Sequence, residues 1–210
     1  MTVYSTDESG NTVSETRGAD GSMQVSVENG NGDTIRDTAY KEDGSFSYCY
    51  TYEYNSKGQR IRSNRLNEEG TVESYEITEY NSKGEKSKSI TWKGDGSFFY
   101  GSSYEYDGKG QRIRENSLNE DGTISSFTLS EYDASGNTIR RTRYRADGTV
   151  SGFDEYEYDE SGYRTHYVSY KGDGTKSYEY FYRTLEDGTY QSKSIWYNSD
   201  GSVREDNDWE

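Results

Sequence analysis

Glycine recurs along this sequence with a fixed period of twenty-six positions, in two interleaved series whose members alternate at spacings of twelve and fourteen. The first series is Gly32, Gly58, Gly84, Gly110, Gly136, Gly162 and Gly188, and the second is Gly44, Gly70, Gly96, Gly122, Gly148 and Gly174. A fixed period of this length is the signature of a repeat protein, in which each repeat packs mainly against its neighbours.

The repeats predict a single domain over 1–210 with three parts. We expect a degenerate N-terminal cap over 1–31, six regular repeats of that period over 32–187 and a C-terminal cap over 188–210, because the glycine spacing is regular only in the middle part. A longer duplication is superimposed on the repeat of twenty-six positions. Residues 40–80 match residues 92–132 at 24 of 41 positions, an offset of two repeats.

Each glycine closes a short polar string, as in the run Asn55-Ser56-Lys57-Gly58. Asn or Asp first and Gly fourth is typical of a type I turn whose glycine forms the bulge of a three-residue hairpin loop. This interpretation places Tyr54 opposite Arg60 and Tyr52 opposite Arg62. The predicted fold is all-β, a continuous antiparallel meander of about sixteen short strands in a single-layer or spirally coiled sheet, with no helix.

Tyrosine is concentrated at even-numbered positions, which hold 18 of the 22 tyrosines between residues 33 and 197. Side chains alternate between the two faces of a strand, and the turn spacings are even, so we expect even numbers to mark one face throughout. The odd face would then carry a thin aliphatic stripe, with Ile61 opposite Ile77 and Ile113 opposite Leu129. The candidate recognition surface is the even aromatic row: Tyr40, Tyr54, Tyr80, Trp92, Tyr106, Tyr132, Tyr144, Tyr158, Tyr170 and Trp196.

Composition sets this chain apart from an ordinary globular domain. Leu, Ile, Val and Phe total only 26 of 210 residues and the net charge is −15, a balance that is typical of disorder. The 23 tyrosines and the absence of proline argue for order instead, because tyrosine favours strands. A quasi-one-dimensional sheet needs only cross-strand contacts between neighbouring strands.

The same composition excludes several classes of function. No stretch reaches the ~20 apolar residues of a membrane-spanning helix, and the N-terminal residues lack the blocks of a secretory signal. Cys49 and His166 are each the one residue of their type, so no disulfide, metal site or cofactor is expected. The acidic excess argues against nucleic acid as a partner. The sequence leaves two cellular locations: the cytoplasm, or the cell surface or exterior if this chain is part of a longer protein.

Three motifs suggest functional interpretations that we weigh against plain structural ones. Acidic turns such as the one around Gly108 could attract calcium, but their carboxylates lack the alternating spacing of a calcium loop. Bases interleaved with tyrosine, such as Arg60 and Arg112, resemble a single-strand binding groove but are explained by pairing with tyrosines and acids. Periodicity opposes catalysis, which needs unlike groups converging in a cleft, so we do not expect an enzyme.

The strings Tyr104-Glu105-Tyr106-Asp107-Gly108-Lys109-Gly110-Gln111, Glu131-Tyr132-Asp133-Ala134-Ser135-Gly136-Asn137 and Tyr156-Glu157-Tyr158-Asp159-Glu160-Ser161-Gly162 resemble the YD-peptide repeats of bacterial Rhs-type and teneurin-like proteins. The Asp-Gly-Thr triplets at Gly122, Gly148 and Gly174 fit the second half of that motif. The resemblance implies β-hairpins that spiral into a non-catalytic shell. The pattern is also similar to the flat single-layer sheet of a spirochaetal outer-surface lipoprotein, and more loosely to aromatic hairpin repeats of cell-wall-binding modules.

Three functional hypotheses follow. The leading one is a non-enzymatic bacterial β-hairpin repeat protein, or part of one, that serves as a scaffold or a protein-recognition surface. The alternative is a cytosolic acidic inhibitor or immunity protein that binds a partner protein, with nucleic-acid mimicry as one mode. The third is carbohydrate binding by the tyrosine and tryptophan row.

Overall fold

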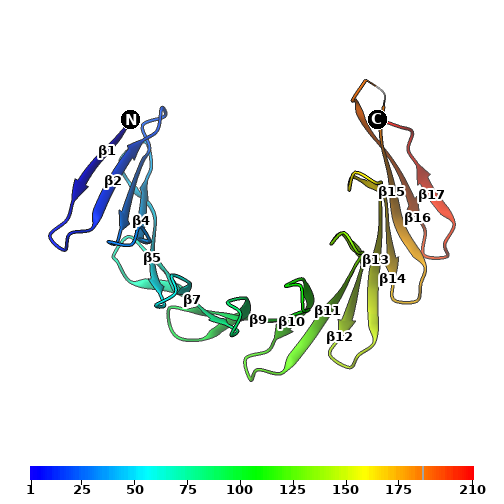
Figure 1. Cartoon of the computed structure of the whole chain (residues 1–210), viewed down its shortest axis with the longest axis horizontal. Coiled ribbons are helices and arrows are strands. Elements are labelled where there is room, and N and C mark those ends of the chain that lie inside the picture. Colours follow the sequence, from blue (N-terminus) through cyan, green and yellow to red (C-terminus); the bar gives the residue numbers. More distant parts are fainter. Residues whose placement is uncertain (186) are drawn as a thin grey trace. The chain divides into compact units, whose positions relative to one another are not determined.

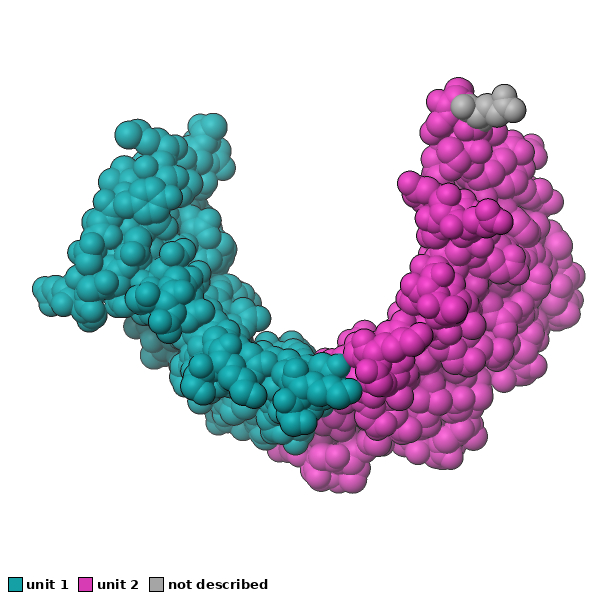
Figure 2. Space-filling view, viewed as in Figure 1, with its two compact units in different colours: residues 1–101 teal, residues 102–210 magenta. Residues whose placement is uncertain are grey.

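The computed structural model describes residues 1–185 and 187–210, and its described residues form seventeen strands in one open antiparallel sheet with no helix (Figure 1). The all-β meander predicted from the glycine repeat is therefore confirmed. The chain divides into two compact units, residues 1–101 and 102–210 (Figure 2). None of the described residues belongs to a helix long and apolar enough to span a bilayer.

The first unit contains eight complete strands and the beginning of a ninth. These are β1 (Thr2–Thr6), β2 (Thr12–Arg17), β3 (Met23–Glu28), β4 (Thr34–Tyr40), β5 (Phe46–Tyr54), β6 (Arg60–Leu66), β7 (Val72–Tyr80), β8 (Lys86–Lys93) and β9 (Phe98–Tyr106). The second unit contains the end of β9 and the remaining strands. These are β10 (Arg112–Leu118), β11 (Ile124–Tyr132), β12 (Thr138–Arg145), β13 (Val150–Tyr158), β14 (Arg164–Lys171), β15 (Lys176–Thr184), β16 (Tyr190–Tyr197) and β17 (Val203–Asp206).

The turns have the predicted chemistry. At Gly58 the amide donates to the Asn55 carbonyl at 3.0 Å, and the Asn55 amide donates to the Gln59 carbonyl at 2.9 Å. Gly58 has a φ of 75°, in the left-handed region that other residues avoid, so its type is required by the backbone. The Asn55 side-chain oxygen also accepts the Gln59 amide at 3.0 Å. Sixteen turn glycines have a positive φ, and no other described residue does.

The aspartate of the Asp-Gly-Ser and Asp-Gly-Thr turns is likewise used inside the turn. The Asp95 carboxylate accepts the Ser97 amide at 2.9 Å and the Ser97 hydroxyl at 2.7 Å. These hydrogen bonds hold the pKa of Asp95 below its usual value. The Asp95 carboxylate is therefore used by its own turn.

Strand register differs from the prediction because most hairpins contain a second bulge. Tyr54 does face Arg60, but the next pair is Glu53 with Arg62, which leaves Ile61 as an extra residue. The predicted pairing of Tyr52 with Arg62 is therefore wrong, and Tyr52 faces Ser63. The same shift puts Arg62, rather than Ile61, opposite Ile77. A bulge of this kind sets two residues against one and increases local twist.

Beyond each bulge, the even-numbered residues of one strand lie on the same face as the odd-numbered residues of the next strand. Shifts occur in every hairpin from β3–β4 to β7–β8 and from β10–β11 to β14–β15. The β1–β2 and β2–β3 hairpins have no shift, and there the spacing of the turn glycines Gly10, Gly21 and Gly32 shortens to eleven positions. The expectation that even numbers mark one face is thus wrong, because even residues of alternate strands point to opposite faces.

We name the two faces by what they carry in each unit. The tyrosine face holds the even-numbered residues of odd strands beyond the bulge near the start of each strand, such as Tyr50 and Tyr52 in β5 of unit 1 and Tyr180 and Tyr182 in β15 of unit 2. The ladder face is the opposite one, and it holds Arg62 and its equivalents. Within each unit the described strands contact only their neighbours along the chain, so the sheet there is a single layer.

Burial is correspondingly thin. Cys49 and Val168 are the buried apolar side chains of the described residues, and most other buried side chains are polar. Stability therefore depends on the hydrogen-bonded ladder and on cross-strand side-chain pairs, each of which contributes about 0.2–1 kcal/mol.

Candidate recognition surface

Tyrosines at the ends of odd strands tie neighbouring hairpins together. The Tyr54 hydroxyl donates to the Thr34 carbonyl at 2.7 Å, and the Tyr158 hydroxyl donates to the Thr138 carbonyl at 2.9 Å. Tyr80 and Tyr132 make the same bond, to the carbonyls of Arg60 and Arg112 respectively. Burial raises the pKa of Tyr54 and of Tyr158, which keeps both hydroxyls protonated as donors. These hydroxyls are already used within the fold.

The predicted row of aromatic residues is split between the two faces. Tyr54, Tyr80, Tyr132, Tyr158 and Trp196 lie on the tyrosine face, since each belongs to an odd strand or to β16, which pairs with β15 without a shift. Tyr40, Trp92, Tyr144 and Tyr170 lie on the ladder face. Tyr106 ends β9. The ten residues therefore do not form one surface.

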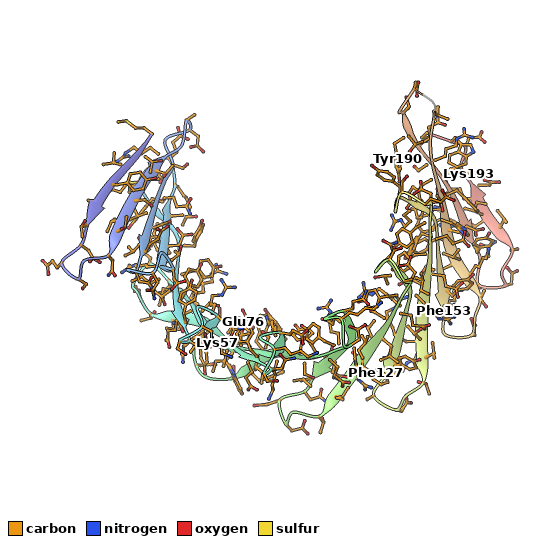
Figure 3. All side chains as sticks on the ribbon, viewed as in Figure 1. Lys57, Glu76, Phe127, Phe153, Tyr190 and Lys193 are labelled. Atoms are coloured by element: carbon orange, nitrogen blue, oxygen red, sulfur yellow. The ribbon has the colours of Figure 1, made fainter. Side chains whose placement is uncertain are left out.

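The ladder face carries arginines stacked on aromatic rings of the next strand, each ring thirteen positions further along the chain. Arg62 lies 4.5 Å from the centre of the Tyr75 ring in unit 1. In unit 2, Arg114 lies 4.0 Å from the centre of Phe127 and Arg140 lies 4.3 Å from that of Phe153 (Figure 3). Such contacts contribute about 0.5–1 kcal/mol at exposed sites.

The arginine and aromatic side chains of the ladder face in unit 2 are covered by contacts with other residues of the chain. Phe127 stacks on Tyr144 at 4.6 Å, and Phe153 stacks on Tyr170 at 4.4 Å, so the other ring faces are covered as well. Arg114 also lies 3.7 Å from the exposed Glu105 carboxylate. The ladder face of unit 2 thus has a structural explanation for its aromatic and basic residues.

His166 belongs to the same structural pattern. Its ring stacks on Phe181 at 4.4 Å, and its Nε2 lies 3.3 Å from the buried Glu179 carboxylate. Glu179 also accepts Lys176 Nζ at 2.8 Å and the Tyr197 hydroxyl. Burial opposes ionisation of Glu179, but these bonds outweigh it and hold its pKa below the usual value. Burial and the Glu179 carboxylate raise the pKa of Tyr197 to about 12.

The tyrosine face of unit 2 carries the densest group of aromatic side chains. We call it the aromatic cluster, and it consists of Tyr156, Tyr167, Tyr178, Tyr180, Tyr182, Tyr190 and Trp196. Ring centres lie 5.2 Å apart for Tyr156 and Tyr167, 4.9 Å for Tyr178 and Trp196, and 5.8 Å for Tyr182 and Tyr190. Tyr190 projects from β16 and is 57% exposed (Figure 3).

An arginine and a buried ion pair hold the aromatic cluster in place. Arg164 lies 4.7 Å from the centre of the Tyr182 ring and donates to its hydroxyl at 3.0 Å. Beside the cluster, Arg143 pairs with the buried Asp154 carboxylate, which also accepts the Tyr167 hydroxyl at 3.2 Å. Burial, the hydrogen bond with the Tyr178 hydroxyl and the nearby Asp154 carboxylate raise the pKa of Tyr167. Its hydroxyl is therefore a fixed donor at neutral pH.

The expectation that even numbers mark one face explains why sequence reasoning missed Tyr167, whereas the other six members have even numbers and Trp196 belongs to the predicted row. The odd number of Tyr167 predicts the opposite face, yet Tyr167 faces both Tyr156 and Tyr180 across its two neighbouring strands. The run Tyr178-Glu179-Tyr180-Phe181-Tyr182 was the available signal, since it places three tyrosines on one face of one strand.

Comparisons with known proteins concern the fold. No family model matches this chain, and no curated protein matches it. A porin-like protein from Bacteroides uniformis is similar in structure with a TM-score of 0.45 and 11% identity, over 98% of this chain and 92% of that one. The TcdB2-TccC3 structure is similar with a TM-score of 0.39 and 13% identity, over 98% of this chain and 15% of that one. Neither likeness bears on function.

Proposed function

We propose that this β-hairpin repeat protein is a non-enzymatic scaffold that recognises a partner protein through the aromatic cluster on the tyrosine face of unit 2. The resemblance of its Tyr-Asp strings to YD-peptide repeats supports the scaffold role, because those repeats build non-catalytic β structures. The observation that carries the recognition role is the composition of this surface, where the tyrosines and the tryptophan of the cluster lie beside Arg164 on an uncovered face of a single-layer sheet.

Those three residue types dominate the binding energy of protein interfaces. Tyr, Trp and Arg are enriched at positions whose truncation weakens binding by about 2 kcal/mol or more, because they offer large, rigid areas with a polar end. In the aromatic cluster the rings are already held by neighbours, as in the pair Tyr180–Tyr182 with rings 13° from parallel at 6.2 Å. Little side-chain entropy is then lost when a partner binds.

The geometry of the rings favours a protein over a sugar at this cluster. Ring faces are taken up by stacking between cluster members such as Tyr182 and Tyr190 at 22°. What remains is ring edges and hydroxyl groups, which suit the mixed apolar and hydrogen-bonding surface of a protein. The net charge of −15 favours a partner with a basic rim, since complementary charge steers encounter.

The test is a quantitative pull-down with the full chain as bait, from a lysate of the cells that encode it. We expect Tyr190→Ala and Tyr182→Ala to reduce retention of the partner at least about tenfold, as for truncation of an interface anchor. The matched control is Tyr163→Ala, which removes a ring that is 67% exposed in a turn outside the cluster. Circular dichroism of each variant reports whether the sheet is intact.

Two results would contradict the proposal. The first is equal retention by wild type, Tyr190→Ala and Tyr182→Ala. The second is a partner that elutes in moderate salt from all variants alike, which would favour the acidic-inhibitor alternative because exposed charge pairs are screened by salt.

A further inference from the structure

A pocket on the tyrosine face of unit 1 has no part in the proposed protein interface. Its volume is about 230 Å³, below the about 300–1,000 Å³ of sites for drug-sized ligands, so it has room only for a smaller ligand. Strands β5 to β9 contribute its lining, and all of that lining belongs to unit 1. Tyr50, Phe99 and Tyr100 supply aromatic surface, while Ser63, Ser74, Glu76 and Thr91 supply polar groups.

Thr91 is the unusual member of this lining. Its side-chain oxygen is buried and has no hydrogen-bond partner among the described residues, and the residue as a whole is 8% exposed. Buried polar groups are nearly always hydrogen-bonded, and an unpartnered one calls for an explanation. The Thr91 oxygen has almost no accessible surface, so a ligand hydroxyl becomes its missing partner only after a small movement of the side chains that cover it.

Glu76, labelled in Figure 3, provides an ionised acceptor in the lining of the same pocket. Its carboxylate accepts Lys86 Nζ at 3.0 Å and the hydroxyl of the buried Ser89. Burial opposes ionisation, but these two bonds hold the pKa of Glu76 below its usual value. A carboxylate offers several lone pairs, so Glu76 can accept a ligand hydroxyl in addition to its two donors.

The aromatic side of the pocket is open to solvent. Phe99 is 58% exposed and Tyr100 is 54% exposed, with ring centres 5.2 Å apart and planes at 60°. Aromatic rings that stay this exposed in a sheet interior are available for stacking by a ligand. Tyr50 is held beside them by its stack on Tyr52, at 8° and 6.4 Å.

Charge around the pocket is balanced, which selects against an ionic ligand. Arg65 pairs with Glu73 at 3.1 Å, and Glu76 pairs with Lys86. A cation or anion entering the pocket would have to replace one of these partners. A neutral ligand with several hydroxyl groups and an apolar face would satisfy the hydroxyl and carboxylate acceptors and still stack on the rings.

The pocket is also not a by-product of the repeat. The positions two repeats further along, the offset of the duplication, lie in unit 2. There Glu76 is replaced by Thr128, Thr91 by Arg143 and Tyr100 by Gly152, and Arg143 pairs with Asp154. The carboxylate, the unpartnered hydroxyl and the exposed rings thus occur together in unit 1 and not at the equivalent positions of unit 2.

We propose that this pocket binds one neutral sugar residue of a glycan. The apolar face of the sugar ring stacks on Tyr100 and Phe99, and sugar hydroxyls donate to the Glu76 carboxylate and exchange a hydrogen bond with Thr91. The site goes beyond the protein-recognition function proposed above, because it lies in the other unit and shares no residue with the aromatic cluster.

The test is a titration of the isotopically labelled full chain with neutral monosaccharides, namely glucose, galactose, mannose and N-acetylglucosamine, followed through the ring signals of Tyr100 and Phe99. We expect at least one sugar to produce saturable shifts with a Kd on the order of 1 mM, which is typical of a ligand of about a dozen heavy atoms. Tyr100→Ala should weaken that binding about tenfold. Thr91→Val should weaken it less, about threefold, because the sheet and the rings are unchanged.

Tyr163→Ala serves as the control that removes an exposed ring elsewhere, and it should leave the titration unchanged. The proposal is overturned if no sugar in the panel gives saturable shifts, or if Tyr100→Ala binds as wild type does while its circular dichroism shows an intact sheet. Stronger shifts with choline or with glucosamine, both cationic, would also overturn it in favour of a cation site. None of these outcomes depends on the partner protein, so failure here leaves the aromatic-cluster proposal standing.

Discussion

Positions two repeats apart in the two units share a backbone and differ in the side chains that they place on it. Leu66 faces Val72 in unit 1 just as Leu118 faces Ile124 in unit 2, with the same register shift beside each pair. Yet Thr91 lines an open pocket, while its counterpart Arg143 fills the equivalent position and pairs with Asp154. The turns and bulges therefore determine the sheet, and the faces are free to change.

This freedom follows from the single layer. In a domain with a thick core, a change from threonine to arginine at a buried position would disturb several packed neighbours. Here each side chain meets only the strands on either side, and its other face is open. Function can therefore diverge between copies at a small energetic cost. Exchanging residues between equivalent positions tests how far that holds.

The largest effect is expected at Gly94, whose counterpart in unit 2 is Ala146. A Cβ at Gly94 would overlap the Val72 carbonyl oxygen, and the Gly94 amide donates to the Glu73 carbonyl at 2.6 Å. We expect Gly94→Ala to lower the free energy of unfolding by about 3 kcal/mol, since backbone cannot move aside as a side chain can. Urea unfolding of the full chain measures this.

Gly108→Ala is the matched control for that substitution. A Cβ there meets nothing within 4 Å, so the change should stay within about 0.5 kcal/mol. If Gly94→Ala were equally harmless, the turn of unit 1 could adopt the geometry of its Ala146 counterpart, and the close approach would not be what requires glycine.

The next largest effect on stability is expected at Arg143, which we replace with threonine, the residue type of its counterpart Thr91 in unit 1. Arg143→Thr leaves the buried Asp154 carboxylate without its cationic partner. Removal of one partner of a buried pair costs up to about 3–5 kcal/mol, but Arg143 is itself partly exposed, so we expect a loss of about 2 kcal/mol. Thermal or urea unfolding provides the measurement.

Arg65→Ser is the reciprocal exchange, since Ser117 occupies that position in unit 2. Both Arg65 and its partner Glu73 are about half exposed, so the change should stay within about 0.5 kcal/mol. Equal losses from Arg143→Thr and Arg65→Ser would show that burial of Asp154 does not distinguish the two units.

The turns of this fold could be predicted from sequence because each carries its own chemistry. Gly58 needs a left-handed backbone, and Asn55 accepts amides within the loop, so a local string of five residues specifies the hairpin. The pairs nearest the turns, such as Tyr40 with Phe46, follow directly and are confirmed. Local chemistry thus predicted the strands and their order.

The second bulge of each hairpin, in contrast, has no residue type that identifies it in the sequence. Ile61 is an ordinary strand residue by type, and nothing near it distinguishes an extra residue from a paired one. One undetected residue reverses every face assignment in the next strand. Thr91 has an odd number and Tyr100 an even one, so the expectation that even numbers mark one face places these two residues on opposite faces, although both line one pocket. The pocket, and the place of Tyr167 in the aromatic cluster, depend on registers that only the three-dimensional structure supplies.

Thr91 gives the third effect, which is a gain in stability. Replacing the unpartnered hydroxyl by a methyl group in Thr91→Val removes a buried polar group with no hydrogen bond, so the free energy of unfolding should rise by about 1 kcal/mol. Thr142→Val in unit 2 is the control, because its buried hydroxyl accepts from Arg140 Nε at 3.4 Å. A loss of stability in Thr91→Val would mean that the hydroxyl has a partner after all, and the sugar site would lose its main observation.

The smallest effect is a pH dependence that belongs to unit 1, since Glu76 has the non-titrating Thr128 as its counterpart. The folded pKa of Glu76 lies below its ordinary value of 4.5, so its contribution to stability is present above pH 4.5 and is lost as pH falls through the folded pKa. Glu76→Gln should therefore lower stability by about 0.5 kcal/mol at neutral pH, as for a partly exposed pair, and have no effect in strong acid, below the folded pKa. Glu179 in unit 2 titrates in both proteins, so the difference between the two urea profiles isolates Glu76. If Glu76→Gln lowered the free energy of unfolding equally at neutral pH and in strong acid, the loss would come from altered packing of the side chain and not from its charge. The pocket would then lack the ionised acceptor that the sugar site requires.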